Sequence, residues 1–290
     1  MPKKAIITAA GSGTRFLPAT KAQPKEMLPI IDKPIIQYSV EELADSGVKD
    51  IIIVTKQTGH ITENHFDDHF ELEDQLEKTG KTKFLAEVRK SAELANFIFL
   101  RQKSSMPYGN GTPLKISADI VSDGPFFYLF GDDITRAKVP VCKQLALALE
   151  QNPDAAAVIG VREIPQEETS KYGIVKIKEG TTNEVETFVE KPKVDEAPSN
   201  LAACGRYLFT PKILPIIESL AVGKDNELWL TDAIIELAKS EKVIFHKIEG
   251  DWFTTGDPLN FLKASVEFAF DREDLKKDFE EYLRDFLGKK

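Results

Sequence analysis

Positively charged side chains accompany a glycine-rich loop near the start of the chain. The loop spans residues 11–15, beginning with Gly11 and ending with Arg15, and Lys25 follows ten residues later. The backbone N–H groups of such a loop bind anions, and the two cations place further positive charge beside them. We therefore expect this segment to bind the phosphates of a nucleotide. A tight turn that binds no ligand is the alternative.

Comparison with known phosphate-loop patterns limits the kinds of nucleotide that the loop at residues 11–15 could bind. A dinucleotide-binding fingerprint needs a third glycine and an acidic residue that closes the second strand. This chain has Phe16 at the position of that glycine, and Lys56 follows the second predicted strand. A Walker A loop needs Gly-Lys followed by Ser or Thr, and this loop lacks that triplet. With both patterns excluded, Arg15 and Lys25 indicate a site for a triphosphate.

An acidic pair, Asp132 and Asp133, follows the most apolar predicted strand, Phe126–Phe130. Ligands of open α/β sheets bind at the carboxyl ends of the strands, which is where this pair lies. A carboxylate in that position, beside a phosphate-binding loop, suits a hard cation such as Mg²⁺. Because Gly-Asp-Asp is also favourable turn chemistry, a solvated turn is the alternative.

A second charged pair, Glu190 and Lys191, follows a predicted strand at residues 185–189. A carboxylate can accept hydrogen bonds from sugar hydroxyls, and a lysine can pair with a phosphate. Taken as an isolated tripeptide with Pro192, the pair is more typical of a surface salt bridge.

A parallel sheet would bring these residues together. Residues 5–10 and 51–54 are continuous apolar runs typical of strands buried on both faces, and residues 34–44 have helical spacing between them. A strand, a helix and a strand in this order predict an α/β fold with a right-handed crossover. Further strands are predicted at residues 98–102, 126–130, 155–161, 173–178, 185–189, 204–209 and 243–247.

Helical patterns occupy most of the remaining chain. They cover residues 61–94, 114–120, 141–149, 212–220 and 230–239, and residues 251–258 are predicted to be a loop. An amphipathic helix is predicted over residues 259–287, with an apolar face suited to the core or to a subunit contact. We predict one α/β domain over residues 1–264 and a helical tail over residues 265–290.

Composition limits the class of protein. The chain has 290 residues and a formal net charge of −9, which argues against a protein that coats nucleic acid. No run of about 18 apolar residues predicts a membrane span, and the start of the chain has no signal-peptide core. The two cysteines, Cys142 and Cys204, have no metal-binding spacing with the histidines. We therefore predict a cytoplasmic protein with reduced cysteines.

The ordered motifs of the chain resemble those of the bacterial UTP–glucose-1-phosphate uridylyltransferases, within the wider sugar-phosphate nucleotidyltransferase family. The resemblance runs from Lys3 to about Ala264. It implies a Rossmann-like, mostly parallel mixed sheet flanked by helices, of the nucleotide-diphospho-sugar transferase type. The segments that carry it are residues 9–21 (Ala-Ala-Gly-Ser-Gly-Thr-Arg-Phe-Leu-Pro-Ala-Thr-Lys), 24–29 (Pro-Lys-Glu-Met-Leu-Pro), 32–34, 131–133, 172–174, 189–192, 197–201, 205–207 and 230–234.

The resemblance also implies a reaction, in which UTP and glucose 1-phosphate give UDP-glucose and pyrophosphate by in-line attack on the α-phosphorus. It implies Mg²⁺ as cofactor, with Asp132 as its ligand. The residues implied to hold the uracil base are Ala10, Gly11, Gln102 and Gly109. Those implied for the triphosphate are Gly13, Thr14, Arg15 and Lys25. Those implied for the sugar phosphate are Asp133, Gly173, Glu190 and Lys191. Arg15, Lys25, Asp132 and Lys191 are the implied catalytic groups, and a homo-oligomer is expected.

The chain departs from the family pattern at two places. The second glycine loop reads Gly-Asn-Gly-Thr-Pro at residues 109–113 where the uridylyl branch usually has Gly-Leu-Gly-His-Ala. Near the end of the domain, Thr254 stands where relatives usually carry an aspartate that is often a second ligand of the magnesium ion. Either Asp132 holds the metal with water and substrate oxygens, or Asp251 or Asp257 replaces the missing ligand, or the activity is altered. Two alternatives follow: an enzyme that uses dTTP or another hexose 1-phosphate, and a catalytically weak regulatory paralogue that binds nucleotide sugars.

Overall fold

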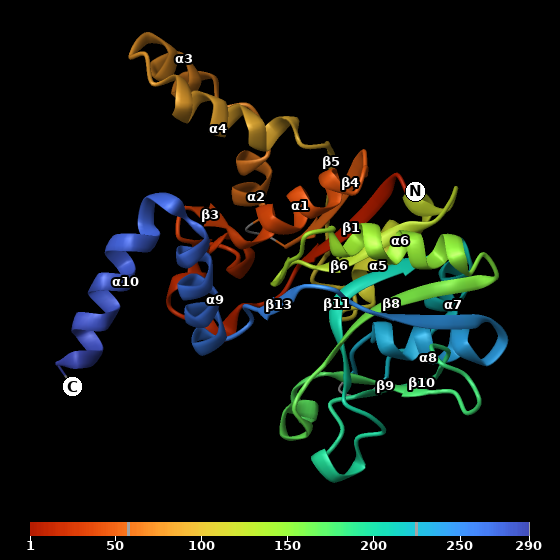
Figure 1. Cartoon of the computed structure of the whole chain (residues 1–290). Coiled ribbons are helices and arrows are strands. Elements are labelled where there is room, and N and C mark those ends of the chain that lie inside the picture. Colours follow the sequence, from red (N-terminus) through yellow and green to blue (C-terminus); the bar gives the residue numbers. More distant parts are fainter. Residues whose placement is uncertain (57–58, 224–225, 290) are drawn as a thin grey trace.

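A computed structural model describes residues 1–56, 59–223 and 226–289 of the chain. Within these residues, nine strands form a mixed sheet that runs β5–β4–β1–β6–β11–β8–β12, with β9 and β10 extending from β11 (Figure 1). The strands are β1 (Lys4–Ala9), β4 (Asp50–Thr55), β5 (Asn96–Arg101), β6 (Phe126–Phe130), β8 (Ala155–Glu163), β9 (Gly173–Ile177), β10 (Val185–Glu190), β11 (Leu201–Phe209) and β12 (Lys242–Lys247).

The direction of the strands decides where a site can form. β1, β4, β5 and β6 are all parallel, so their carboxyl ends meet at one edge of the sheet. β11 runs antiparallel to β6 and β8, which makes the sheet mixed. The predicted mostly parallel α/β sheet is therefore confirmed, and the apolar runs that predicted β1, β4 and β6 are buried on both faces.

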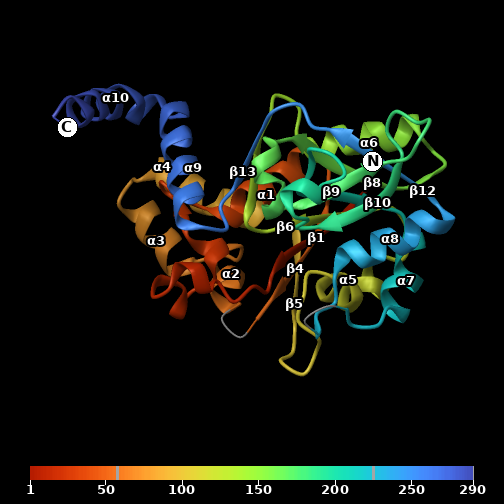
Figure 2. The same cartoon turned by 90° about the horizontal axis from the view of Figure 1, so that it is seen from below.

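Helices cover both faces of the sheet because successive strand side chains point in opposite directions. Ile6 and Ile52 pack toward a group formed by α5, α7 and α8, which Figure 2 shows together on one side of the sheet. Ile7 and Ile53 pack toward α1 and α6 on the other side. The bounds of these helices are α1 (Ile35–Asp45), α5 (Thr112–Ser117), α6 (Val141–Gln151), α7 (Leu214–Ser219) and α8 (Leu230–Ser240).

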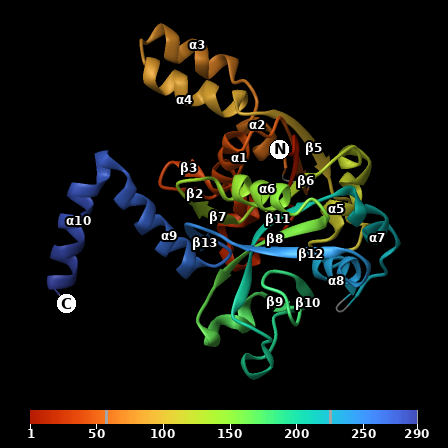
Figure 3. The ribbon, with the colours of Figure 1, turned by 45° about the vertical axis from the view of Figure 1, so that its right-hand side comes forward.

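The predicted helical stretch at residues 61–94 is three helices. They are α2 (His60–His65), α3 (Phe70–Lys78) and α4 (Thr82–Glu93). The α3–α4 hairpin extends away from the sheet, as Figures 1 and 3 show. Phe70 and Phe84 are largely exposed on it, whereas Phe66 at the end of α2 is buried in the core.

Two predictions near the end of the chain are wrong in part. Residues 251–258 are not all loop, because β13 (Asp251–Thr254) pairs antiparallel with β7 (Asp133–Arg136). The tail is not one helix, because an extended Arg272 separates α9 (Pro258–Asp271) from α10 (Glu273–Gly288). A third short pairing joins β2 (Pro29–Ile30) to β3 (Lys33–Pro34).

The two tail helices are placed differently. α9 packs on the body, where Phe261, Ala264 and Phe268 contact the cluster formed by Leu28, Ile30, Ile35 and Ile134. α10 extends outward from the end of α9 (Figure 1). The predicted boundary between the α/β domain and the tail, after residue 264, therefore falls inside α9. This division of the chain stays a prediction. Within the described residues, no helix has the length and apolar content needed to span a membrane.

Candidate active site

A cleft of about 290 Å³ opens at the carboxyl ends of β1, β5 and β6. This is the edge of an α/β sheet at which ligands bind. The residues predicted from the sequence that line it are Ala10, Gly11, Lys25, Gln102, Gly109, Asp132 and Lys191. The sheet thus brings together side chains that lie up to 181 residues apart in the chain (Ala10 to Lys191).

The second glycine loop forms one wall of this cleft. Gln102 is buried there, and its Nε2 donates to the Pro107 carbonyl at 3.1 Å. Gly109 has a φ of +118°, and a Cβ at that position would lie 2.3 Å from the Leu228 carbonyl oxygen. Only glycine fits both the backbone conformation and the close approach. The loop is fixed to the segment before α8, because the Leu228 N–H donates to the Tyr108 carbonyl at 2.7 Å.

The first glycine loop borders a second hollow of about 200 Å³. All four residues predicted for the triphosphate, Gly13, Thr14, Arg15 and Lys25, line it, and Lys25 and Gly11 also line the larger cleft. Arg15 follows Thr14 in the 3₁₀ helix η1 (Thr14–Phe16), and its Nη1 donates to the Gly256 carbonyl at 3.2 Å. The hollow therefore has backbone and cationic groups along one side, as an anion site requires.

Lys25 and Asp132 face each other where the two hollows meet. The Lys25 Nζ donates to Asp132 Oδ2 at 2.5 Å, and it lies 3.9 Å from Glu26 Oε1. Burial opposes the charge on Lys25, but the attraction of Asp132 and Glu26 outweighs it and raises the pKa of the ammonium. Burial likewise opposes ionisation of Asp132, and the neighbouring ammonium outweighs it and lowers the pKa of that carboxyl. Both groups are charged at neutral pH.

Sequence reasoning missed Glu26 as part of the cleft. Its side chain is buried in the 3₁₀ helix η3 (Lys25–Met27), and burial raises the pKa of its carboxyl to about 7. Among the described residues, nothing donates to its Oε2. The other lining residues that were missed include Tyr108, Glu227 and Trp229. Glu26 lies within a charged motif that gave no sign of burial, and the other three lie on loops without a periodic pattern.

Lys191 reaches the cleft from the end of β10. It has a φ of +44°, uncommon for a residue with a side chain, and its N–H donates to the Tyr172 carbonyl at 3.0 Å. Its Nζ lies 3.6 Å from Glu190 Oε1 and 6.0 Å from the centre of the Trp229 ring. Lys191 is half-exposed and lines the cleft together with Trp229, so its ammonium is accessible to a ligand there.

The other residues predicted for the sugar phosphate lie around the cleft and do not line it. Gly173 and Glu190 are register partners at the ends of β9 and β10. Asp133 is buried, and its Oδ1 accepts from the Trp252 indole at 3.0 Å. Burial, reinforced by the charge of Asp132, raises the pKa of Asp133 to about 7. The Asp133 side chain is thus directed toward Trp252 of β13.

Comparison with known proteins agrees with this arrangement. The sequence matches the nucleotidyl transferase family over residues 4–269. The chain belongs to that family. It is 44% identical over 289 residues to the UTP–glucose-1-phosphate uridylyltransferase of Bacillus subtilis (strain 168), covering 99% of this chain and 98% of the relative.

Solved structures show the same fold. A UDP-glucose pyrophosphorylase complexed with UDP-glucose superposes with a TM-score of 0.84 at 34% identity, covering 94% of this chain and all of that one. A UTP-bound enzyme of the same kind from Acinetobacter baumannii superposes with a TM-score of 0.87 at 33% identity, covering 98% and 99% of the two chains. The nucleotide-diphospho-sugar transferase fold expected from the motifs is therefore confirmed.

Thr254, the departure from the pattern of this nucleotidyltransferase family, lies on β13 opposite Asp133. Neither nearby aspartate takes its place in the cleft. Asp251 Oδ2 accepts from Arg136 Nη2 at 2.9 Å. Asp257 caps α9, accepting from the N–H groups of Leu259 and Asn260. Both carboxylates are thus already used in holding the structure together.

The residues that could hold a metal in this nucleotidyltransferase are few. Across the described residues, no three or more His, Cys, Asp or Glu side chains form a metal-binding group. Three carboxyl groups of the described residues line the cleft, those of Glu26, Asp132 and Glu227. Burial raises the pKa of Glu26 to about 7, whereas at Asp132 burial is outweighed by the Lys25 ammonium, which lowers the pKa and keeps this carboxyl ionised. Mg²⁺ commonly binds through one or two carboxylates together with waters and substrate phosphates. The Asp132 carboxylate therefore fits a metal that arrives with a nucleotide and completes its coordination with phosphate oxygens and water.

Proposed function

We propose that this chain is a UTP–glucose-1-phosphate uridylyltransferase, which makes UDP-glucose and pyrophosphate. The observation that carries the proposal is the Lys25–Asp132 pair, which lies where the larger cleft meets the glycine-rich loop. A base and sugar in the cleft and phosphates along the loop would place the reacting phosphates at this pair. Relatives of that name, 44% identical over almost the whole chain, support the choice of substrates.

The residues of the cleft suit the in-line attack of one phosphate on another. The attacking phosphate of glucose 1-phosphate is already an anion, so no general base is needed. The site must instead hold two negatively charged reactants together and stabilise the charge that develops on the leaving pyrophosphate. Lys191 would hold the attacking phosphate, and Arg15 with Lys25 would stabilise the leaving group.

Asp132 would hold Mg²⁺ together with phosphate oxygens of the nucleotide. When bound there, the ion supplies positive charge that offsets the charge of the phosphates. Lys25 would then move from its pairing with Asp132 toward the phosphates, since both cations compete for the same carboxylate. With Mg²⁺ in place of Lys25 at Asp132, the negative charge of this carboxylate would stay neutralised and would not repel the triphosphate.

The larger cleft would take the uracil and the sugar. Gln102 and the backbone at Ala10, Gly11 and Gly109 offer hydrogen-bonding groups for the base. Gly173 and Glu190, which are register partners beside Lys191, would contribute to the glucose end of the cleft. Asp133 would support it from behind through its bond to Trp252. The second glycine loop departs from the pattern of the uridylyl branch. The same-class alternative is therefore an enzyme that catalyses the same type of reaction but uses dTTP or another hexose 1-phosphate.

One experiment tests the proposal and its alternatives. Pyrophosphate release is measured with Mg²⁺ for each of UTP, dTTP, ATP, CTP and GTP, paired with glucose 1-phosphate and other hexose 1-phosphates. UTP with glucose 1-phosphate is expected to give the highest kcat/KM. A preference for dTTP or for another sugar would favour the same-class alternative. No release with any pair, while UDP-glucose still binds, would favour the regulatory paralogue.

Two further expectations belong to this proposal. A homo-oligomer is expected, and the exposed apolar residues of α10, Tyr282 and Leu287, are a candidate contact surface. A cytoplasmic location is expected because the two cysteines, Cys142 and Cys204, are free thiols, as a reducing compartment favours. Sedimentation of the full chain would test the first expectation.

A further inference from the structure

Arg206 is a fully buried arginine within the sheet, on β11. Cys204 and Leu208, two residues away on either side, belong to the apolar core between the sheet and helices α1 and α6. Strand alternation places Arg206 on this same face, where an apolar side chain would be expected. A charge in such a position is unfavourable unless it is paired and hydrogen-bonded. Packing alone would favour an apolar residue at position 206, so the arginine must serve another purpose.

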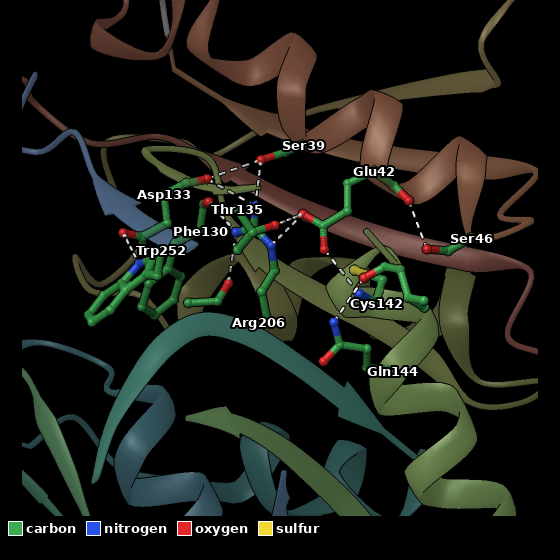
Figure 4. Close-up of polar contacts among 12 residues, drawn as sticks. Ser39, Glu42, Ser46, Phe130, Asp133, Thr135, Cys142, Gln144, Arg206 and Trp252 are labelled. Atoms are coloured by element: carbon green, nitrogen blue, oxygen red, sulfur yellow. Dashed lines mark hydrogen bonds and ion pairs between the residues drawn. The ribbon is translucent and has the colours of Figure 1, made fainter. Parts of the chain in front are cut away.

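Glu42 of α1 supplies the opposite charge. Arg206 Nε donates to Glu42 Oε2 at 2.9 Å, and both side chains are almost wholly buried. The same carboxylate accepts from Thr135 Oγ1 at 2.8 Å and from the Cys142 N–H at 3.0 Å. Figure 4 shows this carboxylate joining α1, β7, the start of α6 and β11. The ion pair is therefore fixed from several elements.

The other side of the guanidinium holds the turn that carries Asp132. Arg206 Nη2 donates to the Asp133 carbonyl at 3.0 Å, and Nη1 reaches the Phe130 carbonyl at 3.5 Å (Figure 4). Ser39 Oγ adds a bond to the Asp133 carbonyl at 3.3 Å and accepts from Arg206 Nη2 at 3.2 Å. One planar group thus contacts the turn on both sides of Asp132.

Two more features hold the Phe130–Asp133 turn in place. Thr255, directly after β13, donates to the Asp132 carbonyl from its N–H at 2.9 Å and from its Oγ1 at 2.7 Å. Gly205 has a φ of +67°, and a Cβ there would lie 2.3 Å from Asp133 Oδ2, so the residue beside Arg206 must be glycine. The backbone of the turn is held from behind, and the Asp132 side chain is left facing the cleft.

We infer that Arg206, through its ion pair with Glu42, is a positioning residue that fixes the Phe130–Asp133 turn and so orients the Asp132 carboxylate toward a bound metal ion. The inference rests on the proposed role of Asp132 in the uridylyltransferase reaction. Partners that orient a metal ligand typically change metal affinity by about 10–100-fold when they are removed. Arginine suits the task because its fixed fork can reach two carbonyls and a carboxylate together.

Binding of Mn²⁺ to the full chain tests the inference without relying on turnover. Electron paramagnetic resonance measures free Mn²⁺ in the presence of saturating UDP-glucose. The test variants are Arg206→Lys, which keeps the charge but loses the fork, and the double variant Arg206→Met with Glu42→Leu. The double variant replaces the ion pair by apolar side chains, a change that buried pairs often tolerate without loss of folding. Both are expected to bind Mn²⁺ about 10-fold or more weakly.

Two controls separate positioning from loss of stability. Leu208→Ala opens a cavity on the same strand without touching the turn, and it is expected to lower Tm while leaving Mn²⁺ affinity unchanged. Asp132→Ala removes the proposed ligand itself, and it is expected to abolish the UDP-glucose-dependent binding of Mn²⁺. Affinity for UDP-glucose without metal should be similar in the Arg206 variants and in the unchanged protein.

The outcomes are distinguishable. Weakened Mn²⁺ binding in both Arg206 variants, with unchanged binding in Leu208→Ala, supports the inference. Unchanged Mn²⁺ affinity in the Arg206 variants overturns it, provided that Asp132→Ala has lost the metal. If Asp132→Ala keeps the metal, the proposed role of Asp132 fails first, and the inference fails with it. An equal loss of affinity in Leu208→Ala at matched Tm also overturns it.

Discussion

The Lys25 ammonium and the Asp132 carboxylate form an ion pair with a nitrogen–oxygen distance of 2.5 Å at the meeting point of the two hollows. The two residues lie 107 positions apart in the chain, at the ends of different elements. In the absence of ligand each neutralises the other, so neither charge is buried alone. The proposed reaction uses both charges separately, Lys25 at the leaving group and Asp132 at the metal.

Removing either member of this pair should impair turnover far more than folding. Lys25→Met keeps the aliphatic chain and removes the charge, and Asp132→Asn keeps the shape and removes the negative charge. Each is expected to lower kcat by about 10²–10³-fold, the usual effect of losing one preorganised electrostatic group. Steady-state rates and circular dichroism measure the two properties. Near-normal rates in either variant would refute the assigned roles.

Glu26 should make the protein less stable as pH rises. Its carboxyl has a pKa of about 7 in the folded chain and an ordinary value of 4.5. Between these values the folded state binds more protons than the unfolded state, so the free energy of unfolding falls as pH increases through this window. Glu26→Gln has no carboxyl to titrate and so lacks this loss. Its free energy of unfolding, relative to that of the unchanged protein, is expected to be about 2–3 kcal/mol higher at pH 8 than at pH 4.5.

Urea unfolding at pH 5 and pH 8 measures this difference. Glu281→Gln on the exposed surface of α10 is the matched control, and its effect on stability should be small at both pH values. A Glu26→Gln variant whose stability relative to the unchanged protein is the same at pH 5 and pH 8 would contradict the raised pKa.

Much of the site could be predicted because its residues follow strands that are obvious in the sequence. The apolar run Phe126–Phe130 predicted β6, and the parallel pairing of β6 with β1 then brought Asp132 close to the first glycine loop. β7 and β13 could not be predicted in this way. Each has four residues with mixed polarity, and each is a strand because the other lies beside it, with Thr254 opposite Asp133.

Contacts between segments far apart in the chain could not be predicted from the sequence either. The charge of Arg206 gave no sign that β11 buries it against Glu42, 164 residues earlier. The glycine at position 109 predicted a turn, but its close approach to Leu228 depends on a segment more than 100 residues later. Such contacts arise from the tertiary packing of elements, and local propensity carries no information about them.

Gly109 should be intolerant of even a methyl group. Gly109→Ala places a Cβ at a φ of +118° and 2.3 Å from the Leu228 carbonyl oxygen, so the loop beside Gln102 must move. We expect a loss of more than about 1 kcal/mol in unfolding free energy, together with weaker UTP binding. Calorimetry and UTP titration measure these effects. Gly124→Ala is the control, because its Cβ would meet nothing within 4 Å, and unchanged binding in both variants would contradict this role for Gly109.

Lys191 should act on the sugar phosphate and not on the nucleotide. Lys191→Met removes the charge beside Glu190 and Trp229, so it is expected to lower kcat/KM for glucose 1-phosphate by about 10²-fold or more. The dissociation constant for UTP alone should change little. Lys193→Met is the control, since that exposed lysine pairs with Glu196 at 2.8 Å on the following turn. A larger effect on UTP than on the sugar phosphate would reverse the assignment.

Thr254 offers a test of whether the metal site is complete with one carboxylate. Thr254 Oγ1 lies 3.9 Å from the position that a Cβ would occupy at Gly256, and Asp132 Oδ2 lies 3.1 Å from the same point. An aspartate at position 254 would therefore bring a second carboxylate near Asp132. With bound metal the added charge should be favourable, and without metal the two carboxylates should repel each other.

Thr254→Asp is accordingly expected to bind Mg²⁺ more tightly and to unfold at a lower temperature in the presence of a chelator. The Mg²⁺ dependence of the rate and the Tm with and without the metal measure both effects. Thr254→Asn is the matched control, because it has the same shape without the charge. A gain in kcat as well as in Mg²⁺ affinity would mean that the native site lacks a ligand, whereas equal behaviour of the two variants would mean that position 254 does not face the metal.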